Sequence, residues 1–202
     1  MSEESSWDAR YAESDRIWSG KPNVVLVAEV AGLTPGRALD LGCGEGADAV
    51  WLARQGWQVT AVDVSGVALS RAAEHAAEAG VRVDFQQHNL EQTMPAGEFD
   101  LISAQFLHFW GEFDREKILR RAADAVAPGG ILLIEGHMNH GPFHHGEHEV
   151  HFPTPDEVIA ALDLDDSWEV LVRAIHPREQ TGPEGDQITR TDATVKLRRR
   201  PS

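Results

Sequence analysis

The chain has 202 residues, of which 42% are hydrophobic and 25% are charged, the composition of one globular domain with a substantial core. Its formal net charge of −15 argues against nucleic acid and anionic membrane surfaces as partners and favours a small molecule. The single cysteine, Cys43, rules out an internal disulfide and suits a reducing compartment, so we expect a cytoplasmic protein. Residues 1–6 lack the apolar run of a signal peptide, and no apolar stretch is long enough to span a bilayer.

The leading segment, residues 1–23, precedes the first expected strand and contains Trp7, Tyr11 and Trp18. Large aromatic side chains in a leading segment need partners that bury them. Two interpretations stay open: a helical cap that packs on the core, or a lid over the mouth of a binding site. A helix over residues 24–31, ended by a glycine, follows this segment.

The most informative stretch is residues 38–46, where a short apolar run ends in an acid and a glycine-rich turn follows. The turn contains Gly42, Gly44 and Gly46, and residues 47–54 read as a helix. Glycines let a ligand approach bare backbone, and the new helix points free N–H groups at it. A strand, a glycine turn and a helix in this order indicate nucleotide binding, whereas a glycine turn alone is as well explained by tight packing.

Two cofactors fit this turn. Gly42, Gly44 and Ala47 match the dinucleotide fingerprint, which is typical of NAD-dependent dehydrogenases. Asp40, however, lies two residues before the first glycine, where it would repel a pyrophosphate and attract a positively charged ligand. The pattern acid-x-Gly-x-Gly-x-Gly resembles motif I of the class I S-adenosylmethionine (SAM)-dependent methyltransferases.

The next two strands also end in polar residues. Residues 58–63 predict a strand that ends in Asp63, roughly 20 residues beyond the turn, where an acid bonds ribose hydroxyls; the alternative is a solvated acid at a strand end. Ser65 is expected to cap a helix that runs to residue 80. A strand over residues 81–86 is followed by Asn89, where the family usually has Asp bonding the adenine amino group, and the Asn carbonyl can do the same.

The resemblance covers most of the chain and looks most like the small-molecule branch, loosely like tellurite-resistance-type methyltransferases. In that family the leading aromatic helix and a Pro-Asn turn cover SAM. Carried over residue by residue, the resemblance assigns SAM binding to Tyr11, Trp18, Asp40, Gly42, Cys43, Gly44, Asp63, Val64, Asn89, Leu90 and Gln105.

The second half of the chain predicts the rest of the sheet. Strands are expected over residues 99–104 and 131–135, with a helix over 114–127 between them, and a capped helix from Thr154. Two final strands over 168–175 and 187–197 are expected to flank a flexible loop over 176–186. The fold class is therefore α/β: a doubly wound, mostly parallel, seven-stranded Rossmann-like sheet with an antiparallel C-terminal strand and an N-terminal helical cap, in one domain, 1–202.

Two histidines at the ligand end of the sheet, His108 and His137, are candidates for a general base, although packing alone also explains His108. His137 opens a histidine-rich stretch, residues 136–153, which is interpreted as a solvated loop, a substrate lid or a metal site. The histidines are interrupted by glycine and proline and show no recognisable zinc pattern, so no metal is predicted.

The resemblance implies an enzyme that transfers a methyl group from SAM to a small-molecule acceptor. Strand 99–104 ends in Ser-Ala-Gln and lacks the Asn/Asp-Pro-Pro-aromatic motif, which disfavours methylation of amino groups on DNA bases. Gln105 stands where metal-dependent catechol methylation would need an acid. Two alternatives stay open: a SAM-binding regulator without turnover, and a NAD-dependent dehydrogenase.

Overall fold

The computed structural model describes residues 2–108, 113–139, 151–181, 185 and 187–201. Within these residues one seven-stranded sheet has the order β3-β2-β1-β4-β5-β7-β6. Its strands are β1 (Arg37–Leu41), β2 (Gln58–Asp63), β3 (Asp84–Gln87), β4 (Phe99–Gln105), β5 (Val126–His137), β6 (Trp168–Thr181) and β7 (Gln187–Arg199).

The strands from β1 to β5 are parallel, and β7 is antiparallel to both of its neighbours, β5 and β6. The strand order reverses between β1 and β4, so the chain leaves these two strands toward helices on opposite faces of the sheet, at the usual ligand site of open α/β folds. The predicted fold class, including the antiparallel C-terminal strand, is confirmed.

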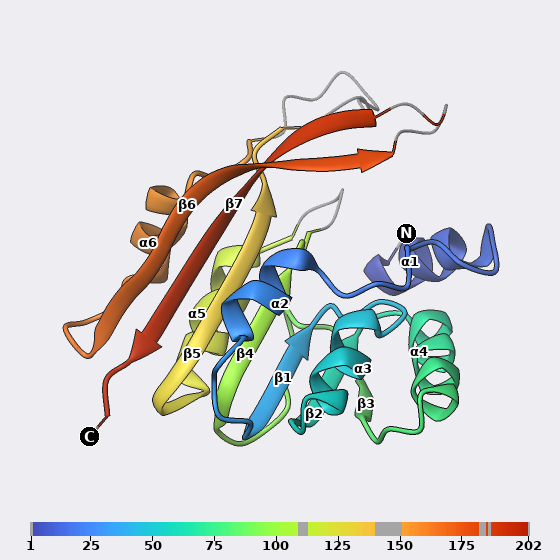
Figure 1. The fold of residues 1–202 in the computed structure, drawn as a ribbon, viewed down its shortest axis with the longest axis horizontal. Coiled ribbons are helices and arrows are strands. Elements are labelled where there is room, and N and C mark those ends of the chain that lie inside the picture. Colours follow the sequence, from blue (N-terminus) through green and yellow to red (C-terminus); the bar gives the residue numbers. More distant parts are fainter. Residues whose placement is uncertain (1, 109–112, 140–150, 182–184, 186, 202) are drawn as a thin grey trace.

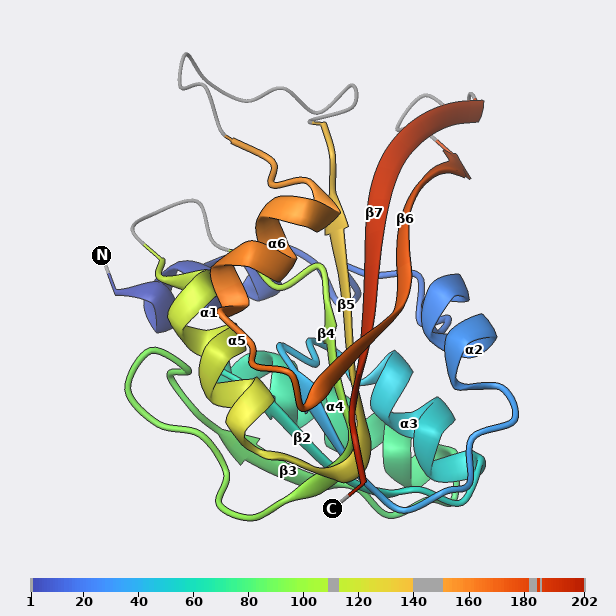
Figure 2. The ribbon, with the colours of Figure 1, turned by 90° about the vertical axis from the view of Figure 1, so that its left-hand side faces the viewer.

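Helices cover both faces of the sheet and give three layers (Figures 1 and 2). One face carries α2 (Val24–Val30), α3 (Ala47–Arg54) and α4 (Gly66–Glu78), and the other carries α5 (Arg115–Asp124) and α6 (Pro155–Leu162). Each face has its own apolar core, since β-strand side chains alternate between the two faces. α1 (Glu3–Ala12) lies apart from these layers, beside the start of α4.

The predicted helix starts are confirmed by their caps. The Ser65 hydroxyl accepts a hydrogen bond from the Ala68 N–H and begins α4. Thr154 and Glu157 form a reciprocal capping box at the start of α6, with Pro155 at the first helical position.

The hairpin of β6 and β7 differs from the prediction. The expected loop over residues 176–186 is wrong at its first half, because His176 to Thr181 continue β6 and pair with residues of β7 from Asp192 back to Gln187. Pro177 suggested a loop, but β6 is an edge strand, where a missing N–H is tolerated. The hairpin therefore extends beyond the end of β5 and curves over the carboxyl ends of the other strands (Figure 1).

Two smaller differences concern strand starts. β3 begins at Asp84 and not at Val81, so the residues after α4 approach the sheet before they pair. β5 begins at Val126 and not at Ile131, since Val126 already pairs with Phe99 before a register shift.

Candidate functional site

The glycine turn between β1 and α3 has a conformation and a packing that require glycine. Gly42, Gly44 and Gly46 have φ values of 69°, 53° and 82°, in the left-handed region. A Cβ added to Gly44 would lie 2.9 Å from the Tyr11 hydroxyl, and one on Gly46 would lie 2.8 Å from Cβ of Ala72. The turn is thus wrapped tightly by the N-terminal segment and by α4.

Asp63 ends β2 beside this turn and is nearly fully buried. Its Oδ2 accepts a hydrogen bond of 2.9 Å from the Gly44 N–H, and its Oδ1 accepts one of 2.9 Å from the Ser65 N–H. Cys43 ties the same turn to β2 through a 2.9 Å bond from its N–H to the Val62 carbonyl. Asp63 therefore shapes the turn, and its carboxylate keeps an acceptor position for a ligand hydroxyl.

Asp40, at the end of β1, is buried and incompletely bonded. Among the described residues no hydrogen-bond partner reaches its Oδ2. Burial, and then repulsion from Asp48 and Asp63, raises the pKa of Asp40 well above its usual value. An unpartnered buried carboxylate oxygen among other acids is costly unless a cation or a strong donor binds it.

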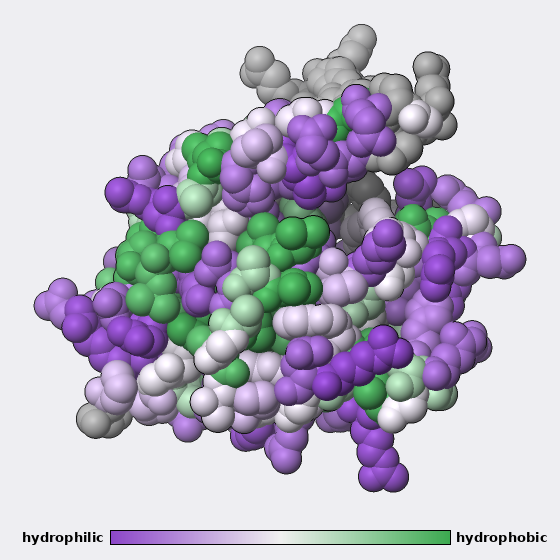
Figure 3. Space-filling view, viewed as in Figure 1, coloured by the Kyte–Doolittle hydropathy of each residue, from purple (hydrophilic) through white to green (hydrophobic). Residues whose placement is uncertain are grey.

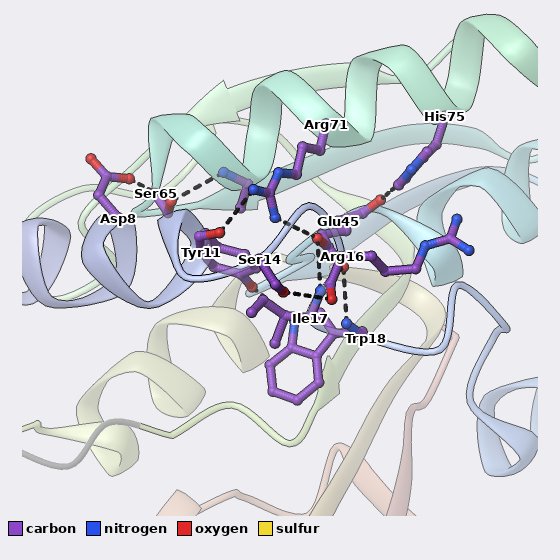
Figure 4. A network of polar contacts seen from close by, with 11 residues as sticks. Asp8, Tyr11, Ser14, Arg16, Ile17, Trp18, Glu45, Ser65, Arg71 and His75 are labelled. Carbon is purple, nitrogen blue, oxygen red and sulfur yellow. Dashed lines mark hydrogen bonds and ion pairs between the residues drawn. The ribbon is translucent and has the colours of Figure 1, made fainter.

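Two acids that the sequence analysis did not single out, Glu45 and Asp48, hold the N-terminal segment in place, and Figure 4 shows the contacts of Glu45. The Glu45 carboxylate accepts hydrogen bonds from the N–H groups of Ile17 and Trp18 at 3.0 to 3.2 Å and pairs with Arg71 at 2.9 Å. Asp48 accepts two bonds of 2.7 Å from the backbone and side-chain N–H groups of Asn23.

The segment itself is tied down by further contacts. The Trp18 indole donates to the Tyr11 hydroxyl at 3.0 Å, and the Ser65 hydroxyl donates to the Asp8 carboxylate at 2.5 Å. Tyr11 is buried, whereas the Trp18 side chain is 45% exposed. The N-terminal segment is therefore a packed cap at Tyr11 and an open rim at Trp18, which combines the two interpretations of the sequence.

Val64 and Asn89 come together at the carboxyl ends of β2 and β3. They line a surface hollow with Ser2, Glu4, Gln87 and Gln92. The Asn89 carbonyl oxygen accepts a hydrogen bond from the Glu91 N–H at 3.0 Å and keeps its second lone pair. Leu90, in contrast, is buried in the core on the other face of the sheet, so it supports this hollow from below.

Gln105 ends β4 and is buried beside Ser103, to whose hydroxyl its side-chain amide donates at 3.1 Å. Among the described residues its carbonyl oxygen Oε1 has no partner. Phe106 follows with a φ of 54°, which is uncommon for a bulky residue and marks a strained turn. The ring of Phe106 stacks on that of His137, with centroids 4.5 Å apart.

The predicted histidines lie near each other, with ring centroids 5.8 Å apart. Nδ1 of His108 lies 2.5 Å from the Phe106 carbonyl oxygen. Nδ1 of His137 lies 2.8 Å from Oδ1 of Asp192 on β7. A second histidine–carboxylate pair lies next to it, where Nε2 of His176 approaches Oε1 of Glu135 at 2.9 Å.

A hollow separates the two groups of residues at the surface. We call the part of the β6–β7 hairpin that extends beyond the end of β5 the distal β6–β7 hairpin. The space-filling view shows a hollow between it and the N-terminal segment (Figure 3). The N-terminal segment borders it on one side, and the β6–β7 hairpin, which pairs with the end of β5, borders it on the other.

The histidine-rich stretch stays a prediction for the most part. His140, His144, His145 and His148 lie outside the described residues. Among the residues that are described, no group of three or more histidine, cysteine or acidic side chains could hold a metal ion. None of the described helices has the length and hydropathy needed to cross a bilayer.

Comparison with known families agrees with this geometry. A family model described as a methyltransferase domain matches residues 38–130, from the first strand and glycine turn to β5. Ubiquinone biosynthesis O-methyltransferase from Caulobacter sp. (strain K31) is 38% identical over 104 residues, which cover 48% of this chain and 39% of that protein. The chain therefore spans less than half the length of the curated relatives that it matches.

Solved structures share the whole fold. TehB from Haemophilus influenzae has a TM-score of 0.70 at 20% identity, covering 98% of this chain and 67% of its own. The N-methyltransferase NodS from Bradyrhizobium japonicum WM9, solved in complex with S-adenosyl-L-homocysteine (SAH), has a TM-score of 0.69 at 16% identity, covering 98% and 99%. Residues 38–130 therefore match a methyltransferase domain, and the sheet order and the glycine turn after Asp40 agree with the fold of the class I SAM-dependent methyltransferases.

Proposed function

We propose that the protein transfers the methyl group of SAM to a small-molecule acceptor by in-line displacement. Asp40 carries this proposal: its buried Oδ2 has no partner among the described residues, beside a turn whose backbone a ligand can approach. Asp48 and Asp63 add to the negative potential there. Such a site attracts the ammonium and sulfonium charges of SAM and repels the pyrophosphate of NAD.

In this proposal, the predicted cofactor residues bind different parts of SAM. Asp40, Gly42 and Gly44 would hold the methionine part, because they surround the turn and the orphaned carboxylate. Asp63 would bond the ribose hydroxyls, and Val64 and Asn89 would line the adenine end in the hollow beside β3. Tyr11, Trp18 and Cys43 would close the turn, and Gln105 would face the cofactor from β4.

The cofactor supplies an activated methyl group, so the protein has to position and enclose the acceptor and, for an acceptor that needs it, remove a proton. Orientation alone contributes on the order of 7–11 kcal/mol in well-aligned reactions. The N-terminal segment, held by Glu45 and Asp48, excludes water on one side. The distal β6–β7 hairpin borders the acceptor side.

The acceptor is a small molecule in this proposal, since the net charge of −15 disfavours nucleic acid. The relative from Caulobacter is named as an O-methyltransferase, which favours an oxygen acceptor. We further propose that residues 1–202 act as one domain, and that the enzyme works in the cytoplasm, where a lone free cysteine is kept reduced.

Titration calorimetry with SAM, SAH and NAD tests the cofactor. We expect SAM and SAH to bind with micromolar affinity, roughly −8 kcal/mol, and NAD to give no heat of binding. Binding of NAD without SAM would overturn the proposal in favour of a dehydrogenase. SAM binding without release of SAH in the presence of any acceptor would favour the alternative of a SAM-binding regulator.

A further inference from the structure

We propose that His137 and Asp192 act as a proton-accepting pair and that the acceptor is a hydroxyl compound, with His137 taking the hydroxyl proton and Asp192 positioning the ring. This rests on the proposed methyl transfer and adds the acceptor class and the fate of the proton. The pair joins the end of β5 to β7, two residues beyond the Gln105–Glu135 pairing and next to the strained turn at Phe106.

Asp192 is held as a carboxylate by two partners. It is fully buried, its Oδ1 lies 2.8 Å from Nδ1 of His137, and its Oδ2 accepts a hydrogen bond from Nε of Arg178. Burial alone would raise the pKa of Asp192, but the hydrogen bonds from His137 and Arg178 outweigh it and lower the pKa below its usual value. A buried carboxylate with two cationic or N–H partners is stable only with the geometry intact.

An ionised Asp192 decides which nitrogen of His137 carries the proton. A carboxylate only accepts hydrogen bonds, so Nδ1 of His137 must be protonated and Nε2 presents its lone pair. The ring is fixed by the stack on Phe106, whose centroid is 4.5 Å away. Desolvation lowers the pKa of His137 and keeps the ring neutral at pH 7, as a proton acceptor requires.

The other histidines near the site lack this arrangement. Desolvation, and then repulsion from His137, lower the pKa of His108 to about 4, too low for a useful base near neutral pH. Nε2 of His176 faces the Thr194 hydroxyl at 2.9 Å and the Glu135 carboxylate at 2.9 Å, so its reactive nitrogen is turned into the protein.

The presence of a base points to the acceptor class. Carboxylates are ionised at neutral pH, thiols, with a pKa of about 8.5, ionise far more readily than ordinary hydroxyls, and a neutral amine attacks before it loses a proton. A hydroxyl is the common acceptor that needs its proton removed as it reacts. The acceptor oxygen then bonds the methyl carbon, the bond from that carbon to sulfur breaks with its electron pair on sulfur, and the hydroxyl proton passes to Nε2 of His137.

The first experiment measures SAH release with probes of each class: catechol, 4-nitrocatechol, a thiophenol, an aniline and benzoate. We expect turnover with the two hydroxyl probes. His137→Gln should lower kcat for catechol by about 100-fold or more, since a positioned base contributes on that order. The loss should be much smaller with 4-nitrocatechol, whose hydroxyl ionises near neutral pH without help.

Asp192→Asn should lower kcat for catechol on the order of 10- to 100-fold with unchanged SAM affinity, because the amide no longer enforces the tautomer. His176→Gln is the matched control: it removes the other histidine–carboxylate pair of the same hairpin and should change kcat less than twofold. Melting curves identify any variant that fails to fold.

Nitrogen-15 NMR of the histidine rings tests the pair independently of turnover. At neutral pH we expect the His137 ring to be neutral with Nδ1 protonated, and to lose this preference in Asp192→Asn. The pKa measured for His137 depends on the charged and titratable groups around the ring. These are Asp192 and Arg190 on β7, Arg178 on β6 and His108 in the turn after β4.

Each outcome separates this proposal from the broader one. Turnover with amine, thiol or carboxylate probes only would overturn the hydroxyl class and leave methyl transfer standing. A folded His137→Gln that keeps full kcat for catechol, or an Nε2-protonated His137, would overturn the base. No SAH release with any probe, despite SAM binding, would overturn both proposals.

Discussion

Buried acidic side chains have different kinds of partner on the two sides of the hollow. On the cofactor side, Asp48 and Asp63 accept hydrogen bonds from backbone or amide N–H groups, and Oδ2 of Asp40 has no hydrogen-bond partner among the described residues. On the hairpin side, Glu135 and Asp192 are each paired with a histidine, and Asp192 also with Arg178. On the first side a buried carboxylate oxygen stays open to a cationic ligand, whereas the acids of the second side face basic side chains nearby.

The methyltransferase-domain match covers the first of these two sides and ends before the second. The matched domain ends at residue 130, before His137 and the whole β6–β7 hairpin. A common cofactor needs the same turn and acids in every member, whereas the acceptor differs from one enzyme to the next. The cofactor side therefore lies mostly within the matched domain, and the hairpin side lies beyond it.

Asp63→Ala gives the largest expected effect on the cofactor side. Losing charge-assisted bonds to the ribose, each worth about 1.5–3 kcal/mol, should weaken SAM binding at least about 100-fold in titration calorimetry. Some loss of stability is also expected, because the Gly44 and Ser65 N–H groups lose their acceptor. Asp84→Ala, an exposed acid on β3, is the control; equal SAM affinity in a folded Asp63→Ala would remove the ribose role.

Glu135→Gln tests the hairpin side through stability. Burial raises the pKa of Glu135 to about 7 from its model-compound value of 4.5. The folded protein then binds this proton more tightly than the unfolded chain, so stability falls as pH rises between these two values, by up to about 3 kcal/mol. Urea unfolding at about pH 5 and about pH 8 should show that the variant loses less stability than the parent over this range.

An unchanged pH dependence in Glu135→Gln would mean that His176 keeps Glu135 ionised throughout, and the raised pKa would be wrong. SAM affinity serves as the internal control, because this change should leave the cofactor side intact.

Glu45→Ala should have the smallest effect on SAM binding. It weakens the contact between the N-terminal segment and the glycine turn. Ile17 and Trp18 lose the acceptor of their N–H groups, and Arg71 loses its partner. We expect faster hydrogen exchange at residues 17–18 and SAM binding weaker by about 10-fold, near 1.4 kcal/mol. Glu13→Ala removes an exposed ion pair of the same segment and should change neither; protection that persists in Glu45→Ala would show that packing alone holds the cap.

Local patterns in the sequence predict the cofactor side well. The glycine turn, the Ser65 cap and the strand that ends in Asp63 are each encoded within a few neighbouring residues. The roles of Glu45 and Asp48 were missed because their partners, Ile17 and Asn23, lie 28 and 25 residues earlier and only the folded turn brings them together.

Contacts on the hairpin side join residues that are still farther apart in the sequence. His137 and Asp192 are 55 residues apart, and no local pattern indicates that β7 would pair with β5 in that register. Pro177 favoured a loop, and only the position of β6 at the sheet edge makes a strand there acceptable. His137 was predicted from its position after a strand, but its carboxylate partner could not be.

The position of β7 has a consequence for the order of folding. β6 precedes β7 in the chain but reaches the sheet only through it, since β7 pairs with β5 on one side and β6 on the other. We expect β1 to β5 to assemble first, and β6 and β7 to form a local hairpin that docks on β5 as one unit, because near contacts form faster than distant ones. We therefore expect the cofactor site on β1 to β4 to form before the β6–β7 hairpin docks on β5. This last docking step brings Asp192 to His137.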